Sequence, residues 1–248
     1  MVNNPPVGTT LLNKHADSFL RLEDLGTKFP RYRPTFFFPG EFINESHRFF
    51  SICPVDGALI QIKDRHWFGQ PIAGWLRRED ALKLYELAYF ASGDVLELGS
   101  YHGLSTSILS QANEDSPLTN TIYSVDRDPA CVQMTYRNVR RKGLGISVRT
   151  LCGDASTLVR RMASEGRSFE FVFVDHSHAY DPVYNVCREL GNLIGLGGFC
   201  LFHDFNDLRN ADGENKDYGV YQAVRDGLNS SAFEFYGIYG CTGLYRRV

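Results

Sequence analysis

One short segment of the chain combines a carboxylate with a glycine turn. Residues 94–106 read Asp-Val-Leu-Glu-Leu-Gly-Ser-Tyr-His-Gly-Leu-Ser-Thr, so Glu97 interrupts an apolar run that breaks at Gly99 and Gly103. A strand that ends in a glycine turn at the start of a helix lets a ligand approach the backbone closely. The carboxylate would repel a pyrophosphate but would suit a hydroxyl, an ammonium or a sulfonium. The segment therefore predicts a nucleoside ligand whose charge is not phosphate.

Acids and histidines also follow the later apolar runs. Because the carboxyl ends of parallel strands meet at one edge of a sheet, we expect these side chains to lie close together. A single histidine more often has a structural role, but several histidines next to two acidic residues favour a functional site. The residues expected at this edge include four of the seven histidines, namely His102, His176, His178 and His203, together with Asp175 and Asp204.

Two other acids can be given roles from their chemistry. Asp126 follows the second strand, where a carboxylate can accept hydrogen bonds from both ribose hydroxyls. Asp154 follows the third strand and could accept from an adenine amine, or could instead cap the helix that begins at Ala155. Glu97 lies in an otherwise apolar strand, and a buried carboxylate without a partner is costly.

A nicotinamide-dependent dehydrogenase is the main alternative for such a nucleoside site. It requires the spacing Gly-x-Gly-x-x-Gly after the first strand. Here the spacing is Gly99-x-x-x-Gly103, and Tyr101 stands where the middle glycine would be. A bulky side chain there hinders a pyrophosphate, and the nearby Glu97 repels it. Both features disfavour the dehydrogenase.

Alternating strands and helices must position these residues. Strands are expected at Val95–Leu98, Thr121–Val125, Ser147–Leu151, Phe169–Val174 and Gly198–Phe202, and helices at Leu104–Ala112, Pro129–Lys142, Ala155–Ser164, Pro182–Ile194 and Val220–Leu228. Ala232–Tyr239 and Thr242–Arg247 are expected to form a closing antiparallel hairpin. The pattern predicts an α/β fold with a doubly wound, mostly parallel, seven-stranded sheet.

The N-terminal part does not show this alternation of strands and helices. Residues 1–75 are expected to form an extension, and residues 76–248 the main domain, which a helix at Arg78–Phe90 introduces. Lys28–Phe38 is basic, aromatic and punctuated by proline, and Trp67, Phe68 and Trp75 add further aromatic rings. The extension could be a lid that recognises substrate, an oligomerisation segment, or an irregular segment packed on the core.

Composition limits the classes of partner. The net charge of -3 argues against a nucleic-acid partner held by bulk electrostatics. No apolar run reaches the roughly 18 residues that span a bilayer, and residues 1–10 do not resemble a signal peptide. Cys152 and Cys200 sit in apolar runs and are expected to be core thiols. We therefore expect a cytoplasmic protein with no membrane partner.

The strand-end motifs resemble a known family. Glu97-Leu-Gly99-Ser100-Tyr101-x-Gly103-x-Ser105, Asp126, Gly153-Asp154 and the closing hairpin are similar to the class I S-adenosylmethionine-dependent methyltransferases, which have a Rossmann-like fold. Asp175-x-x-His178-x-Tyr180 and Phe202-His203-Asp204 resemble a small-molecule O-methyltransferase subfamily. The resemblance covers residues 74–248. It implies that S-adenosylmethionine is held by Glu97, Gly99, Ser100, Tyr101, Gly103, Ser105, Asp126, Arg127, Gly153, Asp154, Ala155, Asp175 and His176.

The resemblance also implies chemistry at the acceptor. It implies methyl transfer to an oxygen or nitrogen of a small molecule, with His178 and Asp175 as catalytic residues. In catechol-type relatives, two aspartates and an asparagine hold a magnesium ion, and Asp175 and Asp204 match the aspartates. Phe205 replaces the asparagine, which leaves His203 or His178 as the further ligand of a divalent metal. Metal-free catalysis by His178 stays open, and so does a homodimer, which is common among related enzymes.

Two other functions stay open. The chain could be a binding or assembly protein on the same scaffold, although the presence of Glu97, Asp126 and Asp154 argues against lost cofactor binding. It could instead be an RNA or protein methyltransferase, with Lys28–Phe38 and the basic residues within 137–142 as a docking surface. Basic residues at a helix C-terminus also simply complement the helix dipole.

Overall fold

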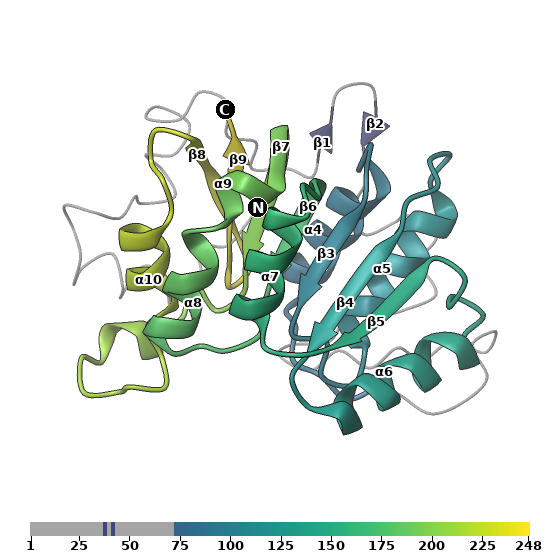
Figure 1. The fold of residues 1–248 in the computed structure, drawn as a ribbon, viewed down its shortest axis with the longest axis horizontal. Helices are drawn as coiled ribbons and strands as arrows, with labels where there is room; N and C mark the ends of the chain where they lie inside the picture. The colour runs from purple at the N-terminus through teal and green to yellow at the C-terminus, as the bar shows by residue number, and fades with distance from the viewer. Residues whose placement is uncertain (1–36, 39–40, 43–71) are drawn as a thin grey trace.

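The polar residues singled out in the sequence follow the strands of one seven-stranded sheet (Figure 1). The structure is a computed structural model that describes residues 37–38, 41–42 and 72–248, except for the side chains of residues 37, 38, 41, 42, 78 and 79. Within the predicted N-terminal extension, β1 (Phe37–Phe38) and β2 (Glu41–Phe42) pair as an antiparallel ladder. Most of the Lys28–Phe38 segment, together with Trp67 and Phe68, lies outside the described residues.

The main sheet has the strand order β5-β4-β3-β6-β7-β9-β8. The first five of these strands are parallel, while β9 is antiparallel to both β7 and β8. This confirms the predicted doubly wound sheet with its closing hairpin. The strands are β3 (Val95–Leu98), β4 (Ile122–Asp126), β5 (Val148–Cys152), β6 (Phe169–Val174), β7 (Ile194–Phe202), β8 (Phe233–Tyr239) and β9 (Thr242–Arg247).

One helix, α4, precedes these strands in the chain, and the other helices lie between them. They are α4 (Arg78–Tyr89), α5 (Leu104–Asp115), α6 (Pro129–Arg141), α7 (Ala155–Ser164), α8 (Tyr180–Cys187), α9 (Leu190–Leu193) and α10 (Val220–Gly227), with a 3-10 turn at Leu208–Ala211. The single helix expected at Pro182–Ile194 is wrong. It divides into α8 and α9 at Arg188 and Glu189, and Ile194 already pairs with Phe169 as part of β7.

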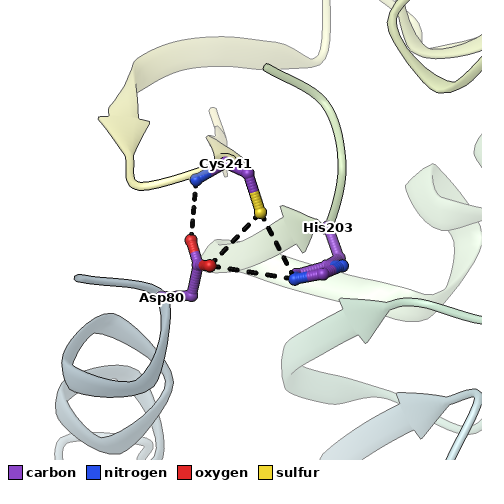
Figure 2. Close-up of side chains that lie close together, drawn as sticks. All are labelled: Asp80, His203 and Cys241. Atoms are coloured by element: carbon purple, nitrogen blue, oxygen red, sulfur yellow. Dashed lines mark hydrogen bonds and ion pairs between the residues drawn. The ribbon is translucent and has the colours of Figure 1, made fainter. Parts of the chain in front are cut away.

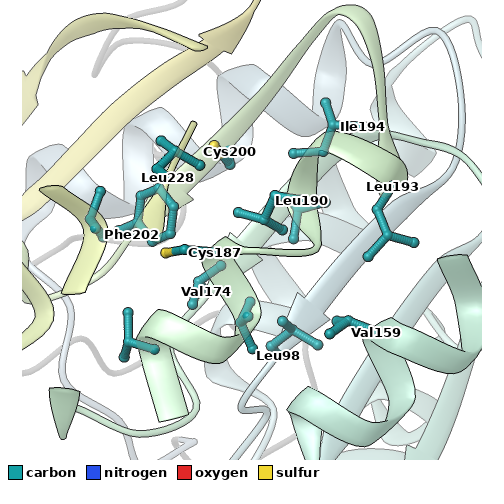
Figure 3. Close-up of a cluster of buried hydrophobic side chains, with 14 of the residues drawn as sticks. Leu98, Val159, Val174, Cys187, Leu190, Leu193, Ile194, Cys200, Phe202 and Leu228 are labelled. Atoms are coloured by element: carbon teal, nitrogen blue, oxygen red, sulfur yellow. The ribbon is translucent and has the colours of Figure 1, made fainter. Parts of the chain in front are cut away.

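Two apolar cores lie on opposite faces of the sheet. One core joins the sheet to α7, α8, α9 and α10, and Figure 3 shows part of it around Leu98, Val174 and Leu190. The other core joins the sheet to α4 and α5. Because strand side chains alternate in direction, Leu96 and Leu98 enter the first core, so Glu97 faces α5 on the other side.

The described cysteines are unpaired and differ in burial. Cys200 is buried as expected, but the expectation for Cys152 is wrong because this residue is exposed. Cys152 ends β5, which is an edge strand of the sheet, so its side chain reaches solvent. Among the described helices, none combines the length and apolarity needed to cross a bilayer.

Candidate active site

The register of the sheet brings three strand ends into one row. Leu98 pairs with Val174, and Val174 pairs with Phe202, at the last positions of β3, β6 and β7. Gly99, Asp175 and His203 directly follow these residues, so they are neighbours at one edge. Since β9 runs antiparallel to β7, the Gly240–Cys241 turn between β8 and β9 reaches this edge as well.

The loop after β3 has a strained, closely packed backbone. Gly99 has φ 99°, and a Cβ atom there would overlap the carbonyl oxygen of Asp175. Gly103 has φ 86° at the N-terminus of α5, and Tyr101 has φ 46°, which is rare for a residue with a side chain. Such strain persists only where the surroundings enforce it, and it gathers at functional sites.

Asp126 holds this loop in place. Its Oδ2 accepts a hydrogen bond from the backbone N–H of Tyr101 at 2.9 Å, and its Oδ1 accepts one from the N–H of Asp128 at 2.9 Å. The carboxylate therefore links the ends of β3 and β4. It also lines the cavity described below, where the sequence predicts that it binds ribose hydroxyls.

Glu97 is fully buried beneath the loop. Its Oε2 accepts hydrogen bonds from the hydroxyls of Thr106 at 2.5 Å and Ser124 at 2.6 Å. Within the described part of the chain, its Oε1 is buried and accepts no hydrogen bond of normal geometry. Burial raises the pKa of Glu97 to about 7, although hydroxyls including that of Ser105 favour the ionised form.

Asp154 forms the N-cap of α7. Its Oδ1 accepts hydrogen bonds from the backbone N–H and the hydroxyl of Thr157, both at 2.9 Å. The backbone hydrogen bond from Thr157 is the main reason that the pKa of Asp154 lies below its usual value. The structure therefore shows the capping role, while contact with an adenine amine stays a prediction.

A cavity of about 700 Å³ lies at the carboxyl ends of the strands. This volume is within the range of small-molecule sites. The predicted site residues that line it are Gly99, Ser100, Tyr101, Ser105, Asp126, Arg127, Asp175, His176, His178, His203 and Asp204. The predicted site residues outside its lining are Glu97, Gly103, Gly153, Asp154 and Ala155.

His178 stands between two carboxylates and an aromatic ring. Its Nε2 lies 3.2 Å from Oδ2 of Asp204 and 3.6 Å from Oδ1 of Asp175. Its ring stacks on that of Tyr218, with centroids 4.9 Å apart and an angle of 10° between the planes. The guanidinium of Arg209 covers Tyr218 at 3.9 Å from the ring centroid. These contacts hold the imidazole in one orientation at the cavity wall.

His203 faces different groups with its two ring nitrogens. Its Nδ1 lies 3.1 Å from Oδ1 of Asp175, and its Nε2 lies 3.3 Å from Sγ of Cys241. Burial opposes a charged imidazole, but the carboxylate of Asp175 outweighs it and holds the pKa of His203 well above its ordinary value. Burial likewise opposes ionisation of Asp175 and Asp204, yet the neighbouring His203 keeps the pKa of both carboxyls low.

His176 presents a neutral ring to the cavity. Burial lowers its pKa to about 4, against the effect of nearby carboxylates such as Asp175. Its Nε2 is buried and has no hydrogen-bond partner among the described residues. A buried polar atom of this kind needs a partner, which a bound polar ligand would supply.

The donor set at Asp175 and Asp204 does not fit magnesium. Both carboxylates face imidazoles, whereas Mg²⁺ requires oxygen ligands in near-octahedral geometry. Phe205, at the position of the third ligand in the relatives, is buried in the apolar core. The group of atoms from Asp175, His178 and His203 that could hold an ion contains two ring nitrogens. We therefore derive no catalytic step through magnesium.

Several residues at the cavity were not predicted from the sequence. Trp75, at the end of the predicted extension, lines the cavity with its ring centroid 5.9 Å from that of Tyr101. Cys241 lines it from the β8–β9 turn, where the antiparallel pairing of β9 with β7 could have pointed to it. The remaining lining residues that were not among the predicted site residues are Ala73, Gly74, Leu76, Arg77, Leu104, Asp128, Cys131, Asp207, Arg209 and Tyr218.

Comparisons with known proteins agree with this architecture. The family model described as a methyltransferase domain matches residues 96–205. An O-methyltransferase from Bacillus cereus, solved in complex with S-adenosylhomocysteine (SAH), has a TM-score of 0.59 at 14% identity, over 70% of this chain and 82% of that one. A comparison with curated proteins found no match.

A second solved structure is similar in the same way. The O-methyltransferase TomG from Streptomyces achromogenes, described as involved in tomaymycin synthesis and solved in complex with S-adenosylmethionine, has a TM-score of 0.54 at 21% identity. The similarity covers 66% of this chain and 78% of TomG. Residues 96–205 thus match a methyltransferase domain, and the chain shares the Rossmann-like fold of these O-methyltransferases.

Proposed function

We propose that this chain transfers a methyl group from S-adenosylmethionine to an oxygen, or a nitrogen, of a small-molecule acceptor. The observation that carries the proposal is that one cavity joins the glycine loop after β3 to the His178 cluster after β6 and β7. We call the part around Gly99 and Asp126 the donor half, and the part around His178 and His203 the acceptor half.

The donor half suits a nucleoside with an amino-acid tail. Gly99 and Ser100 line the cavity next to Asp126, and Nε2 of His176 is a buried polar atom with no partner among the described residues. Bound S-adenosylmethionine would supply a methyl group on a sulfonium sulfur. In this proposal Asp126 and Arg127 contact its nucleoside, and the other predicted cofactor residues that line the cavity complete the site.

The acceptor half suits removal of a proton. Because Nε2 of His178 faces Asp204 and Asp175, Nδ1 is the nitrogen that takes the proton from an acceptor hydroxyl. The two carboxylates then stabilise the imidazolium. The oxygen, freed of its proton, bonds to the methyl carbon while the bond from that carbon to sulfur breaks. In-line positioning supplies much of the rate enhancement.

A small acceptor is favoured over RNA or protein by the position of the basic cluster on α6. The N-terminal end of α6 touches the cavity through Cys131. The basic end lies about 15 Å further along the helix at 1.5 Å per residue. Arg140 there donates a hydrogen bond to the Tyr136 hydroxyl at 2.9 Å. The cluster therefore does not border the reacting groups.

Methyl transfer can be tested with labelled S-adenosylmethionine. We expect transfer to at least one member of a panel of small phenols and alcohols, and none to structured RNA or to unrelated proteins. Transfer only to RNA, with a steep salt dependence, would favour the macromolecular alternative. Binding of SAH without any transfer would favour a non-catalytic binding protein.

Two properties of the whole protein also stay predictions. A homodimer would give twice the mass of 28.1 kDa in light scattering after gel filtration. A cytoplasmic location is expected from the sequence and would be checked by cell fractionation.

A further inference from the structure

On the far side of His203 from Asp175, three buried side chains converge from distant parts of the chain (Figure 2). Asp80 comes from the first turn of α4, His203 from the end of β7, and Cys241 from the β8–β9 turn. Their exposed fractions are 0%, 7% and 4%. The proposed methyl transfer uses neither Asp80 nor Cys241.

From this cluster we infer a binding site for a thiophilic divalent metal ion, best matched by Zn²⁺, with Asp80 Oδ2, His203 Nε2 and Cys241 Sγ as its ligands. Thiolate, imidazole and carboxylate are the three protein ligand types of zinc. Sites with three protein ligands keep the fourth position for water or substrate.

The spacing of the three atoms fits tetrahedral coordination. Sγ lies 3.2 Å from Oδ2 and 3.3 Å from Nε2, and Nε2 lies 3.8 Å from Oδ2. Tetrahedral bonds of normal zinc length would separate such ligand atoms by roughly 3.3–3.6 Å. Shifts of a few tenths of an ångström would therefore complete the geometry.

Neighbouring groups already orient the ligands. Oδ1 of Asp80 accepts a hydrogen bond from the backbone N–H of Cys241 at 2.9 Å, and Oδ2 accepts one from that of Arg77 at 2.7 Å. On His203, Nδ1 lies 3.1 Å from Oδ1 of Asp175 while Nε2 faces the cluster. A carboxylate behind the other nitrogen of a histidine ligand is the usual support of zinc sites.

Charge balance is compatible with a bound dication, which would displace the protons of the Cys241 thiol and of the His203 ring. A carboxylate, a thiolate and a neutral imidazole together carry two negative charges, so a bound Zn²⁺ makes the buried group neutral. Burial of an uncompensated charge is costly, and a neutral complex removes that cost.

The fourth coordination position would face the cavity. His203 and Cys241 line the cavity, whereas Asp80 is buried behind them. An oxygen ligand that entered the acceptor half could complete the tetrahedron, and the metal would lower the pKa of that ligand. This consequence rests on the proposed methyl transfer, while the metal site itself does not.

Metal binding can be measured directly on the full chain. After chelator treatment, we expect titration with Zn²⁺ against a chromophoric chelator to show one site per chain. Cys241→Ser and Asp80→Asn should each weaken it by ~100-fold or more, because loss of a ligand exceeds the 10- to 100-fold effect of an outer-shell change. Cys152→Ser, which alters an exposed thiol, is the matched control and should bind as the wild type does.

A variant of the neighbouring cluster separates the two candidate ion sites. His178→Asn should keep the wild-type zinc affinity, because His178 is not a ligand in this site. Loss of zinc in His178→Asn with retention in Cys241→Ser would instead assign the ion to Asp175, His178 and His203. Failure of the wild type to bind zinc would overturn the inference, whatever the result of SAH binding.

Cobalt spectroscopy covers the case in which a variant does not fold. Wild-type chain loaded with Co²⁺ should show a thiolate-to-cobalt charge-transfer band in the near ultraviolet, together with the visible bands of tetrahedral cobalt. Cys152→Ser should keep the charge-transfer band. Its absence from the wild type would contradict ligation by Cys241.

Discussion

The donor half of the cavity is made largely of backbone, whereas the acceptor half is made of side chains. Around Gly99 a glycine turn and the Asp126 carboxylate shape the wall, through bonds to backbone N–H groups. Around His203 the wall consists of imidazoles, carboxylates and a thiol from three separate segments. The donor half thus depends on a local backbone conformation, and the acceptor half on the tertiary structure. Mutations should therefore separate binding of the methyl donor from chemistry on the acceptor.

The largest expected effect is on turnover. His178→Asn removes the proposed base while keeping a polar side chain beside Tyr218. We expect methyl transfer to slow by ~10²- to 10⁴-fold, the usual contribution of general base catalysis. The measurement is single-turnover transfer from labelled S-adenosylmethionine. Full turnover in this variant would remove His178 from the catalytic role.

A glycine substitution tests the backbone character of the donor half. Gly99→Ala adds positive-φ strain and an overlap with the Asp175 carbonyl, so we expect a loss of about 3 kcal/mol or more in the free energy of unfolding. SAH binding should weaken as well. Gly143→Ala is the matched control, because Gly143 also has positive φ (77°) but no atom within 4 Å of the added Cβ. It should cost only about 1–2 kcal/mol. If urea denaturation showed equal losses in the free energy of unfolding for Gly99→Ala and Gly143→Ala, close packing around Gly99 would be contradicted.

The pH dependence of stability tests the burial of Glu97. Its pKa is about 7 when folded and near 4.5 when unfolded, so the folded state keeps the proton longer. Wild-type stability should therefore fall as pH rises from about 4.5 to 7, by about 3 kcal/mol from this group alone. Glu97→Gln removes that fall. The free energy of unfolding of the variant, measured by urea denaturation, should therefore increase relative to that of the wild type between pH 5 and pH 8. A constant difference between the two proteins would show that Glu97 does not titrate in this range.

The smallest expected effect lies at the margin of the donor half. Trp75→Ala removes the ring beside Tyr101, and such aromatic pairs contribute about 0.5–1.5 kcal/mol. SAH affinity should weaken by less than about tenfold, measured by calorimetry. Leu196→Ala is the control, because Leu196 is an exposed apolar residue outside the cavity lining. An unchanged affinity in Trp75→Ala would place Trp75 outside the donor site.

The two halves also differ in what the sequence predicts. The fold and the glycine loop were predictable because apolar runs and glycine positions are local signals. Asp175, His178 and His203 were predictable because they follow strands. Asp80 was not, because an acid in the first turn of a helix also serves as a cap, and only the packing of α4 brings it to His203.

Some predicted residues have structural roles that the motif does not reveal. Asp154 caps α7, and Glu97 lies under the glycine loop rather than in the cavity wall. The division of the helix after β6 was also missed, because neither a glycine nor a proline stands at Arg188 and Glu189, where the first helix ends. Tertiary contacts, rather than local propensity, decide these positions.

The claim that the donor half binds the methyl donor while the acceptor half carries out the chemistry can be tested most directly by calorimetry of SAH binding to three proteins. The wild type should bind SAH. Asp126→Asn should weaken binding by ~10- to 100-fold, the loss expected for hydrogen bonds to a charged group. His178→Asn should bind SAH as tightly as the wild type. Failure of the wild type to bind, or equal weakening in both variants, would contradict the account.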